Sequence, residues 1–92
     1  MKKVRASVRF RGRVQGVNFR AYTQKICRQN SLTGWVRNLP DGDVQALLEG
    51  RESDIRSALE ACRQGPEIAA VDDVLIDWEE YQGEFATFDI RY

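Results

Sequence analysis

The residues between positions 12 and 20, GRVQGVNFR, place two glycines and a terminal arginine in one short stretch. The stretch contains no carboxylate, histidine, cysteine, serine or threonine, so its chemistry must come from backbone and from arginine. Glycines let a backbone curl until several N–H groups point into one concavity, and such a concavity binds anions. The guanidinium of Arg20 adds a planar fork of donors suited to a phosphate group. A glycine-rich turn beside a surface arginine explains the same spacing, and from spacing alone it is the preferred interpretation.

The elements on either side of this stretch determine where the backbone would point. Apolar residues at positions 4, 6, 8 and 10 alternate with polar ones, which predicts a half-buried strand. From Phe19 the apolar spacing becomes helical, and this helix ends near residues 28–34. The loop therefore leads from a strand into the amino end of a helix, whose partial positive charge also favours an anion.

The rest of the chain supplies four more strands and one more helix. We expect strands over residues 33–39 and 43–50, joined by a Pro40–Gly42 turn, and further strands over 71–81 and within 85–92. Ser53 is expected to cap a helix with the inner face Ile55, Ala58, Leu59 and Cys62. The order β-α-β-β-α-β predicts an α+β, ferredoxin-like sandwich: an antiparallel sheet with two helices on one face, plus a short C-terminal strand.

Length and composition predict one globular domain over residues 1–92. The chain is 42% apolar and 30% charged, and no apolar run approaches the roughly 18 residues of a membrane span. No apolar segment follows the N-terminal lysines, so no signal peptide is expected. The expected lack of a signal peptide and the low cysteine content favour a cytoplasmic protein. In that compartment we expect Cys27 and Cys62 to be reduced, buried and chemically inert, and the sequence contains no histidine that could activate them.

The charges divide unevenly between the two halves of a chain whose net charge is zero. Residues 1–38 contain ten of the 14 basic residues and no acid, whereas residues 39–92 contain all 14 acids. The first half could therefore form an anion-binding face. Equally, the two halves could interleave in one sheet and neutralise each other, and the sequence does not choose between these interpretations.

Four motifs together resemble the acylphosphatase family over nearly the whole chain, in order and with their spacing intact. They are GRVQGVNFR, LTGWVRNLPDGDV, a GP followed by valine six residues past the glycine, and the closing FDIRY. The first two are specific and the last two weaker. The resemblance implies a small cytoplasmic hydrolase that cleaves the carboxyl-phosphate anhydride of acyl phosphates without metal or cofactor, and it implies the ferredoxin-like fold.

The resemblance also implies roles for individual residues. Arg20 is expected to bind the substrate phosphate and Asn38 to be catalytic. The phosphate-binding backbone is expected to comprise Gly12, Arg13, Val14, Gln15, Gly16, Val17, Asn18 and Phe19. Without the resemblance, Asn38 would be interpreted as an ordinary strand-end asparagine before a turn. Arg37 should face the opposite side of its strand and receives no role.

Two other functions fit the same fold. One is an RNA-binding module of the RRM type, but the aromatic RNP run that such modules need is missing from the sequence. The other is a regulatory domain that binds phosphate without turnover, which the presence of both Arg20 and Asn38 disfavours. We expect a monomer that acts on a small acyl phosphate and binds neither nucleic acid nor membrane.

Overall fold

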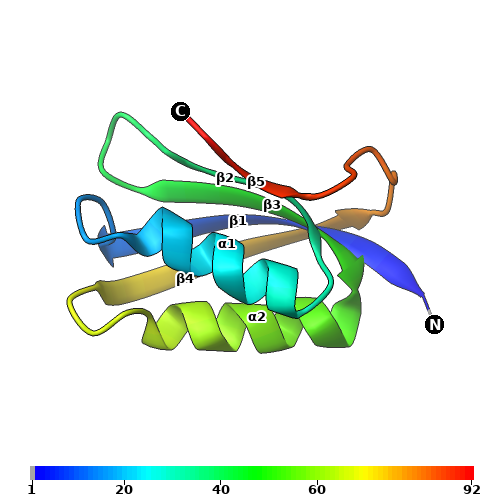
Figure 1. The fold of residues 1–92 in the computed structure, drawn as a ribbon, viewed down its shortest axis with the longest axis horizontal. Helices are drawn as coiled ribbons and strands as arrows, with labels where there is room; N and C mark the ends of the chain where they lie inside the picture. The colour runs from blue at the N-terminus through cyan, green and yellow to red at the C-terminus, as the bar shows by residue number, and fades with distance from the viewer. Residues whose placement is uncertain (1) are drawn as a thin grey trace.

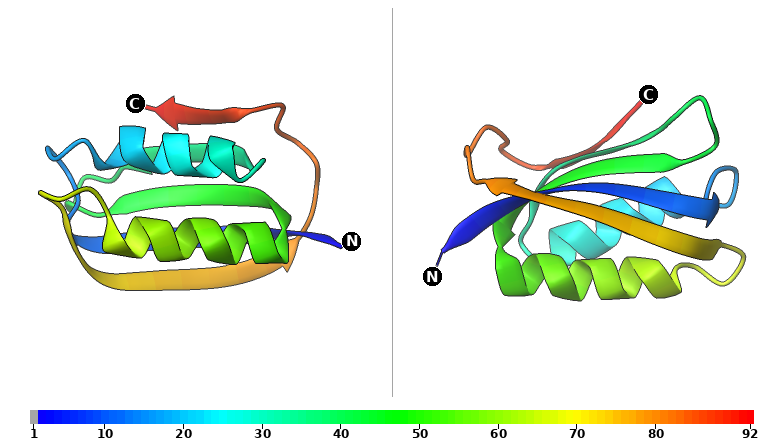
Figure 2. Two further views of the ribbon diagram at one scale, coloured as in Figure 1. Left: turned by 60° about the horizontal axis from the view of Figure 1, so that its bottom comes forward. Right: turned by 180° about the vertical axis from the view of Figure 1, so that it is seen from behind.

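The computed structural model describes residues 2–92 as a five-stranded sheet covered on one side by two helices (Figure 1). The elements are β1 (Lys3–Arg13), α1 (Phe19–Gln29), β2 (Thr33–Asn38), β3 (Val44–Arg51), α2 (Glu52–Gln64), β4 (Ala70–Glu80) and β5 (Phe88–Arg91). Both helices lie on the same face, and the other face is open, as the views in Figure 2 show. The predicted α+β, ferredoxin-like architecture is confirmed.

The strand order is β4-β1-β3-β2-β5, and one pairing corrects the expected antiparallel sheet. The pairs β1–β3, β1–β4 and β2–β3 are antiparallel, whereas β2 and β5 are parallel, with Gly34 opposite Phe88. The reason is the path of the chain. Strand β4 ends at the same end of the sheet at which β2 begins. The segment 81–87 crosses this end of the sheet, so β5 starts beside the start of β2 and runs in the same direction (Figure 2).

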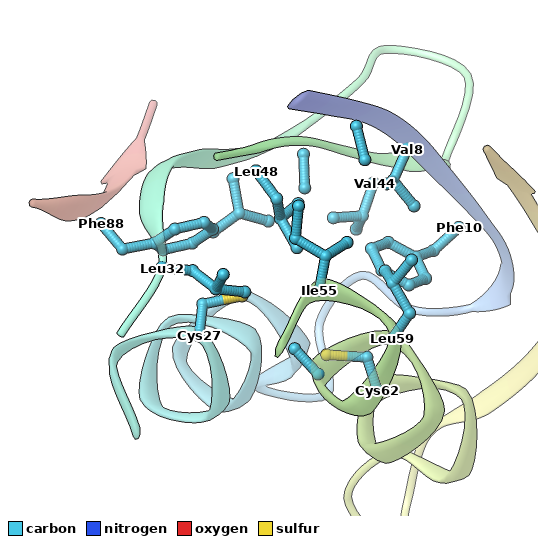
Figure 3. Close-up of a cluster of buried hydrophobic side chains, with 14 of the residues drawn as sticks. Val8, Phe10, Cys27, Leu32, Val44, Leu48, Ile55, Leu59, Cys62 and Phe88 are labelled. Carbon is cyan, nitrogen blue, oxygen red and sulfur yellow. The ribbon is translucent and has the colours of Figure 1, made fainter. Parts of the chain in front are cut away.

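The core lies between the sheet and the helices. Ala6, Val8 and Phe10 alternate along β1 and are fully or almost fully buried, as the period of a half-buried strand requires. Helix α1 buries Phe19, Thr23 and Cys27 at helical spacing. Helix α2 buries the four residues expected of it, and Figure 3 shows its side chains meeting those of β1 and β3. The predicted periodicities of these elements are confirmed.

The start of α2 differs from the expectation. The helix begins at Glu52 with Arg51 as its N-cap, and no side chain caps it. Ser53 therefore lies inside the first turn. Strand β3 runs directly into α2, which leaves no room for a capping loop. Glu52 and Asp54 place negative charge in the first turn, and this charge stabilises the amino end of a helix.

Interleaving of the two halves neutralises the basic residues of β1 on the open face of the sheet. The buried Arg5 Nε lies 3.0 Å from Glu49 Oε2. Asp43 accepts hydrogen bonds from Arg9 Nε and Arg11 Nε at 2.6 and 3.2 Å. For these three arginines, the second of the two charge interpretations is the correct one.

Among the described residues 2–92, no helix has the length and apolarity that crossing a membrane requires. Over the same residues, no group of three or more histidine, cysteine, aspartate or glutamate side chains could hold a metal ion.

Candidate active site

Aromatic and aliphatic side chains fix both ends and the middle of the glycine loop. The rings of Phe10 and Phe19 meet edge to face with centroids 5.0 Å apart, which ties the end of β1 to the start of α1. Val14 is buried between these two anchors and joins the same core. The loop is therefore anchored to the core at three points.

The first glycine of the motif belongs to the strand. Gly12 adopts φ 126° and pairs with Val71, just past a register shift at which β4 carries one extra residue, Asp72. A Cβ at this position would lie 2.1 Å from the carbonyl oxygen of Ala70, so no other residue fits. Gly12 and Arg13 thus continue the ladder with β4, and the curl of the backbone begins at Val14. A role of Gly12 and Arg13 in binding phosphate stays a prediction.

The amides of the curled segment, residues 14–18, have no hydrogen-bond partner among residues 2–92. In the described part of the chain, the backbone N–H groups of residues 14–18 donate no hydrogen bond to another protein group. Gly16 adopts φ 74° and Asn18 φ 63°, a left-handed conformation that glycine and asparagine tolerate best. Free amides on a curled backbone form the kind of concavity that binds an anion.

The amino end of α1 adds to this positive potential. Asn18 is the N-cap residue, but its side chain caps no amide, and the first turn contains no acidic residue. The first helical hydrogen bond of the segment runs from Tyr22 N to Asn18 O at 3.2 Å. The preceding amides are therefore left unsatisfied, and the helix dipole at this end favours a negative ligand.

A cavity of about 230 Å³ opens at the junction of loop and helix. Its lining comprises Val14, Gly16, Asn18, Phe19, Arg20, Ala21, Ile90 and Tyr92. The guanidinium of Arg20 lies 4.9 Å from the centroid of the Tyr92 ring. Within residues 2–92, Arg20 forms no ion pair. Stacking covers a face of the guanidinium and leaves its in-plane donors available, so the cavity contains a cation without a protein counter-ion.

Asn38 lies at the end of β2 and has a buried acceptor without a partner. Strand alternation puts it on the helix-covered side with the buried Val36, while Arg37 stacks over Trp35 on the open side. The Oδ1 atom of Asn38 is buried and accepts no hydrogen bond from any described residue. A buried acceptor of this kind costs about 1–3 kcal/mol unless water or a ligand satisfies it.

The structure brings some of the predicted residues together and leaves others apart. Arg20 and four loop residues line the cavity, whereas Asn38, Gly12, Arg13, Gln15 and Val17 do not. Sequence reasoning assigned nothing to Ile90 and Tyr92, which β5 and the C-terminal residue contribute to the lining. The signal was present in FDIRY, because Phe88, Ile90 and Tyr92 alternate and must share one face of a strand.

The two thiols are unsuited to nucleophilic attack. Cys27 and Cys62 are free and buried between the helices and the sheet (Figure 3). Burial raises the pKa of the Cys62 thiol to about 11 and pushes the pKa of Cys27 well above its ordinary value. Neither thiolate forms to a useful extent near neutral pH, and the cavity lining contains neither residue.

The family model, curated relatives and solved structures each include acylphosphatases that match this chain. The acylphosphatase family model matches residues 6–90. An acylphosphatase from Geobacter metallireducens is 49% identical over 90 residues, which cover 98% of this chain and 97% of that protein. The crystal structure of acylphosphatase from Bacillus subtilis superposes with a TM-score of 0.93 at 34% identity, covering 97% of this chain and 99% of that one. The structure of an acylphosphatase from Coxiella burnetii superposes with a TM-score of 0.86 at 36% identity, covering 98% of this chain and 94% of that one.

Proposed function

This chain belongs to the acylphosphatase family, and we infer from this that it is an acylphosphatase. It hydrolyses the carboxyl-phosphate anhydride of acyl phosphates and releases a carboxylate and inorganic phosphate. The alternatives, an RNA-binding module and a phosphate-binding regulatory domain, are not favoured by a match that covers nearly the whole chain. The residue roles, the mechanism and the surroundings in which the enzyme works are our proposals, as follows.

The phosphate group binds in the concavity between the loop and the start of α1. The observation that carries this proposal is the run of amides at residues 14–18 that have no partner within the described chain. They lie beside the start of α1, which no described side chain caps, and beside Arg20, which pairs with no described acid. Amides and guanidinium hydrogen-bond the phosphate oxygens while their charge redistributes in the transition state. Because acyl phosphates have a good leaving group, positioning and charge stabilisation supply most of the catalysis.

Asn38 orients the attacking water. Its buried, unpartnered Oδ1 accepts one hydrogen of the water, and this leaves the water oxygen free to attack phosphorus in line with the scissile bond. The new bond joins water oxygen to phosphorus, and the phosphorus–oxygen bond to the acyl group breaks, so that the electron pair leaves with the carboxylate. The proton of the water passes to a phosphate oxygen. No histidine exists in the sequence, and this route requires no protein base.

The direction of attack can be tested with isotopically labelled water. The amides of residues 14–18 and the guanidinium of Arg20 together form what we call the phosphate cradle. Hydrolysis of benzoyl phosphate in H₂¹⁸O should place the label in the released phosphate, because the cradle presents phosphorus as the electrophile. Label in benzoate would mean that water attacks the acyl carbon, and the proposed mechanism would be wrong. Asn38→Ala should lower kcat by roughly 100-fold or more while inorganic phosphate still competes with a similar inhibition constant. Normal turnover in this variant would remove Asn38 from the mechanism.

We further propose that the enzyme works as a cytoplasmic monomer without metal, cofactor or nucleic acid. The described residues supply both a cradle of amides and a guanidinium for the phosphate charge, so no cation is needed to neutralise it. Activity should therefore persist in EDTA, and the protein should elute from a sizing column at its monomer mass of 10.6 kDa. A loss of activity in EDTA that added Mg²⁺ restores would contradict the metal-independent mechanism.

A further inference from the structure

The side chain of Gln15 connects the phosphate-binding loop to the β2–β3 hairpin. Its Nε2 donates one hydrogen bond to the carbonyl oxygen of Leu39 at 2.7 Å and one to that of Asp43 at 2.8 Å. A primary amide nitrogen has two protons, and both are used here. The two acceptors lie at opposite ends of the turn that joins β2 to β3, so a single side chain holds both ends of that turn.

The β2–β3 turn, which accepts the hydrogen bonds of Gln15, is also held by bonds of its own. Leu39 N donates to Asp43 O at 2.8 Å, and Asp43 N donates to the side chain of Asp41 at 3.0 Å. The carboxylate of Asp43 in turn binds Arg9 and Arg11 of β1. Because its other contacts fix the turn, a bond from Gln15 transmits the position of the hairpin to the loop.

The neighbours of Gln15 in sequence connect this contact to the reacting groups. Val14 and Gly16, on either side of it, both line the phosphate cavity. Asn38 directly precedes Leu39, one of the two carbonyl acceptors. Gln15 itself does not line the cavity. Its side chain is therefore placed to set the distance between cradle and asparagine without touching the substrate.

We propose that Gln15 is a positioning residue, which aligns the phosphate held by the loop with the water held by Asn38. This inference rests on the proposed function of both groups. In-line attack tolerates little displacement, and an error of about 1 Å between reacting atoms can cost roughly 100-fold in rate. Without the two hydrogen bonds of Gln15, the loop and the hairpin each keep their own structure but lose their mutual register.

The test is a double-mutant cycle between positions 15 and 38, with hydrolysis of benzoyl phosphate as the assay. Gln15→Met keeps the length and approximate shape of the side chain and removes both donors. We expect kcat to fall about 10- to 100-fold. The inhibition constant of inorganic phosphate should change less than about twofold, because the cradle and Arg20 are intact. In the Asn38→Ala background the same change should cost less than about twofold, since no oriented water is left to misalign.

A matched control separates positioning from loss of a hydrogen bond as such. Asn30→Ala removes a side-chain amide bond to a backbone carbonyl, Asn30 Nδ2 to Ile26 O at 2.9 Å, at the far end of α1. Its kcat should stay within about twofold of the wild type. Should Gln15→Met not fold, Gln15→Ala at this half-exposed position serves in the same cycle.

Each contrary outcome has a distinct meaning. If the two effects multiply in the double variant, or if phosphate binding weakens as much as kcat, Gln15 does not act through Asn38 and the inference is wrong. A wild-type kcat in Gln15→Met, with a large loss in Asn38→Ala, overturns the inference alone. A wild-type kcat in Asn38→Ala overturns the proposed role of Asn38, and the inference with it.

Discussion

Replacing Arg20 by lysine keeps the positive charge in the cavity and removes the planar arrangement of hydrogen-bond donors. Arg20 offers a planar fork whose face is stacked 4.9 Å from the centroid of Tyr92. Lysine carries a rotating ammonium that presents a point charge and cannot bind two phosphate oxygens in the same fixed plane. We therefore expect Arg20→Lys to fold normally and to hydrolyse acyl phosphates poorly.

The size of the loss follows from the contacts that lysine gives up. One of two charge-assisted hydrogen bonds disappears, at about 1.5–3 kcal/mol, and the stacking on Tyr92 contributes about 0.5–1 kcal/mol. The sum, about 2–4 kcal/mol, corresponds to a decrease of about 30- to 700-fold in kcat/KM at 1.4 kcal/mol per tenfold. Inorganic phosphate should also compete more weakly, which distinguishes this variant from Asn38→Ala.

The assay is steady-state hydrolysis of benzoyl phosphate, with phosphate as a competitive inhibitor and circular dichroism as the check on folding. Arg63→Lys provides the control, because Arg63 is exposed at the end of α2 and pairs only loosely with Glu60 at 4.0 Å. It should retain wild-type kinetics. A folded Arg20→Lys enzyme with kcat/KM within threefold of the wild type would refute the argument that the fork, and not the charge alone, binds the phosphate.

Three further predictions concern stability and the thiols. Changing both Cys27 and Cys62 to alanine should leave kcat nearly intact. Because packing around the sulfurs is lost, the free energy of unfolding measured in urea titrations should fall by about 1–2 kcal/mol. An inactive but folded double variant would indicate a thiol mechanism. Gly12→Ala should cost about 2 kcal/mol or more, because its Cβ would strike the Ala70 carbonyl, and wild-type stability would contradict the close approach of β1 and β4. Glu49→Gln should cost about 1–3 kcal/mol at pH 7, since it removes the buried carboxylate beside Arg5 and leaves Glu84 as the ion-pair partner of that arginine. Burial alone would raise the pKa of Glu49, but the Gln82 amide and Arg5 outweigh it and hold that pKa below its ordinary value, so this contribution should fade as pH falls through the lowered pKa. A stability difference between wild type and variant that does not shrink in acid would contradict this assignment.

The local elements follow from the sequence because each depends on a pattern within a few residues. Alternation along β1 and helical spacing in α1 and α2 are set by the need to bury one face, and the structure buries those faces. The order of these elements restricts the topology to few arrangements, and the ferredoxin-like one is found. The loop at GRVQG was also identifiable, since glycines and a following helix appear in the sequence itself.

The sequence left the direction of β5 open, and the predicted start of α2 was wrong, because both depend on distant parts of the chain. Strand β5 is parallel to β2 only because segment 81–87 crosses the end of the sheet, where Glu49 accepts bonds from the amides of Gln82 and Gly83. Ser53 satisfies the local rule for a cap, but β3 leads directly into α2 and the helix starts two residues earlier than that cap allows.

By itself, the sequence determined which residues we propose for the chemistry: a glycine loop, Arg20 and Asn38, with no histidine to act as a base. Only the tertiary structure decided how they are surrounded. It placed Ile90 and Tyr92 in the cavity wall, left Asn38 Oδ1 buried without a partner, and joined loop to hairpin through Gln15. Residues 15 and 39 are far apart along the chain, and no short-range pattern encodes a hydrogen bond between them. Such contacts exist only after the sheet has assembled and brought the end of β2 beside the end of β1.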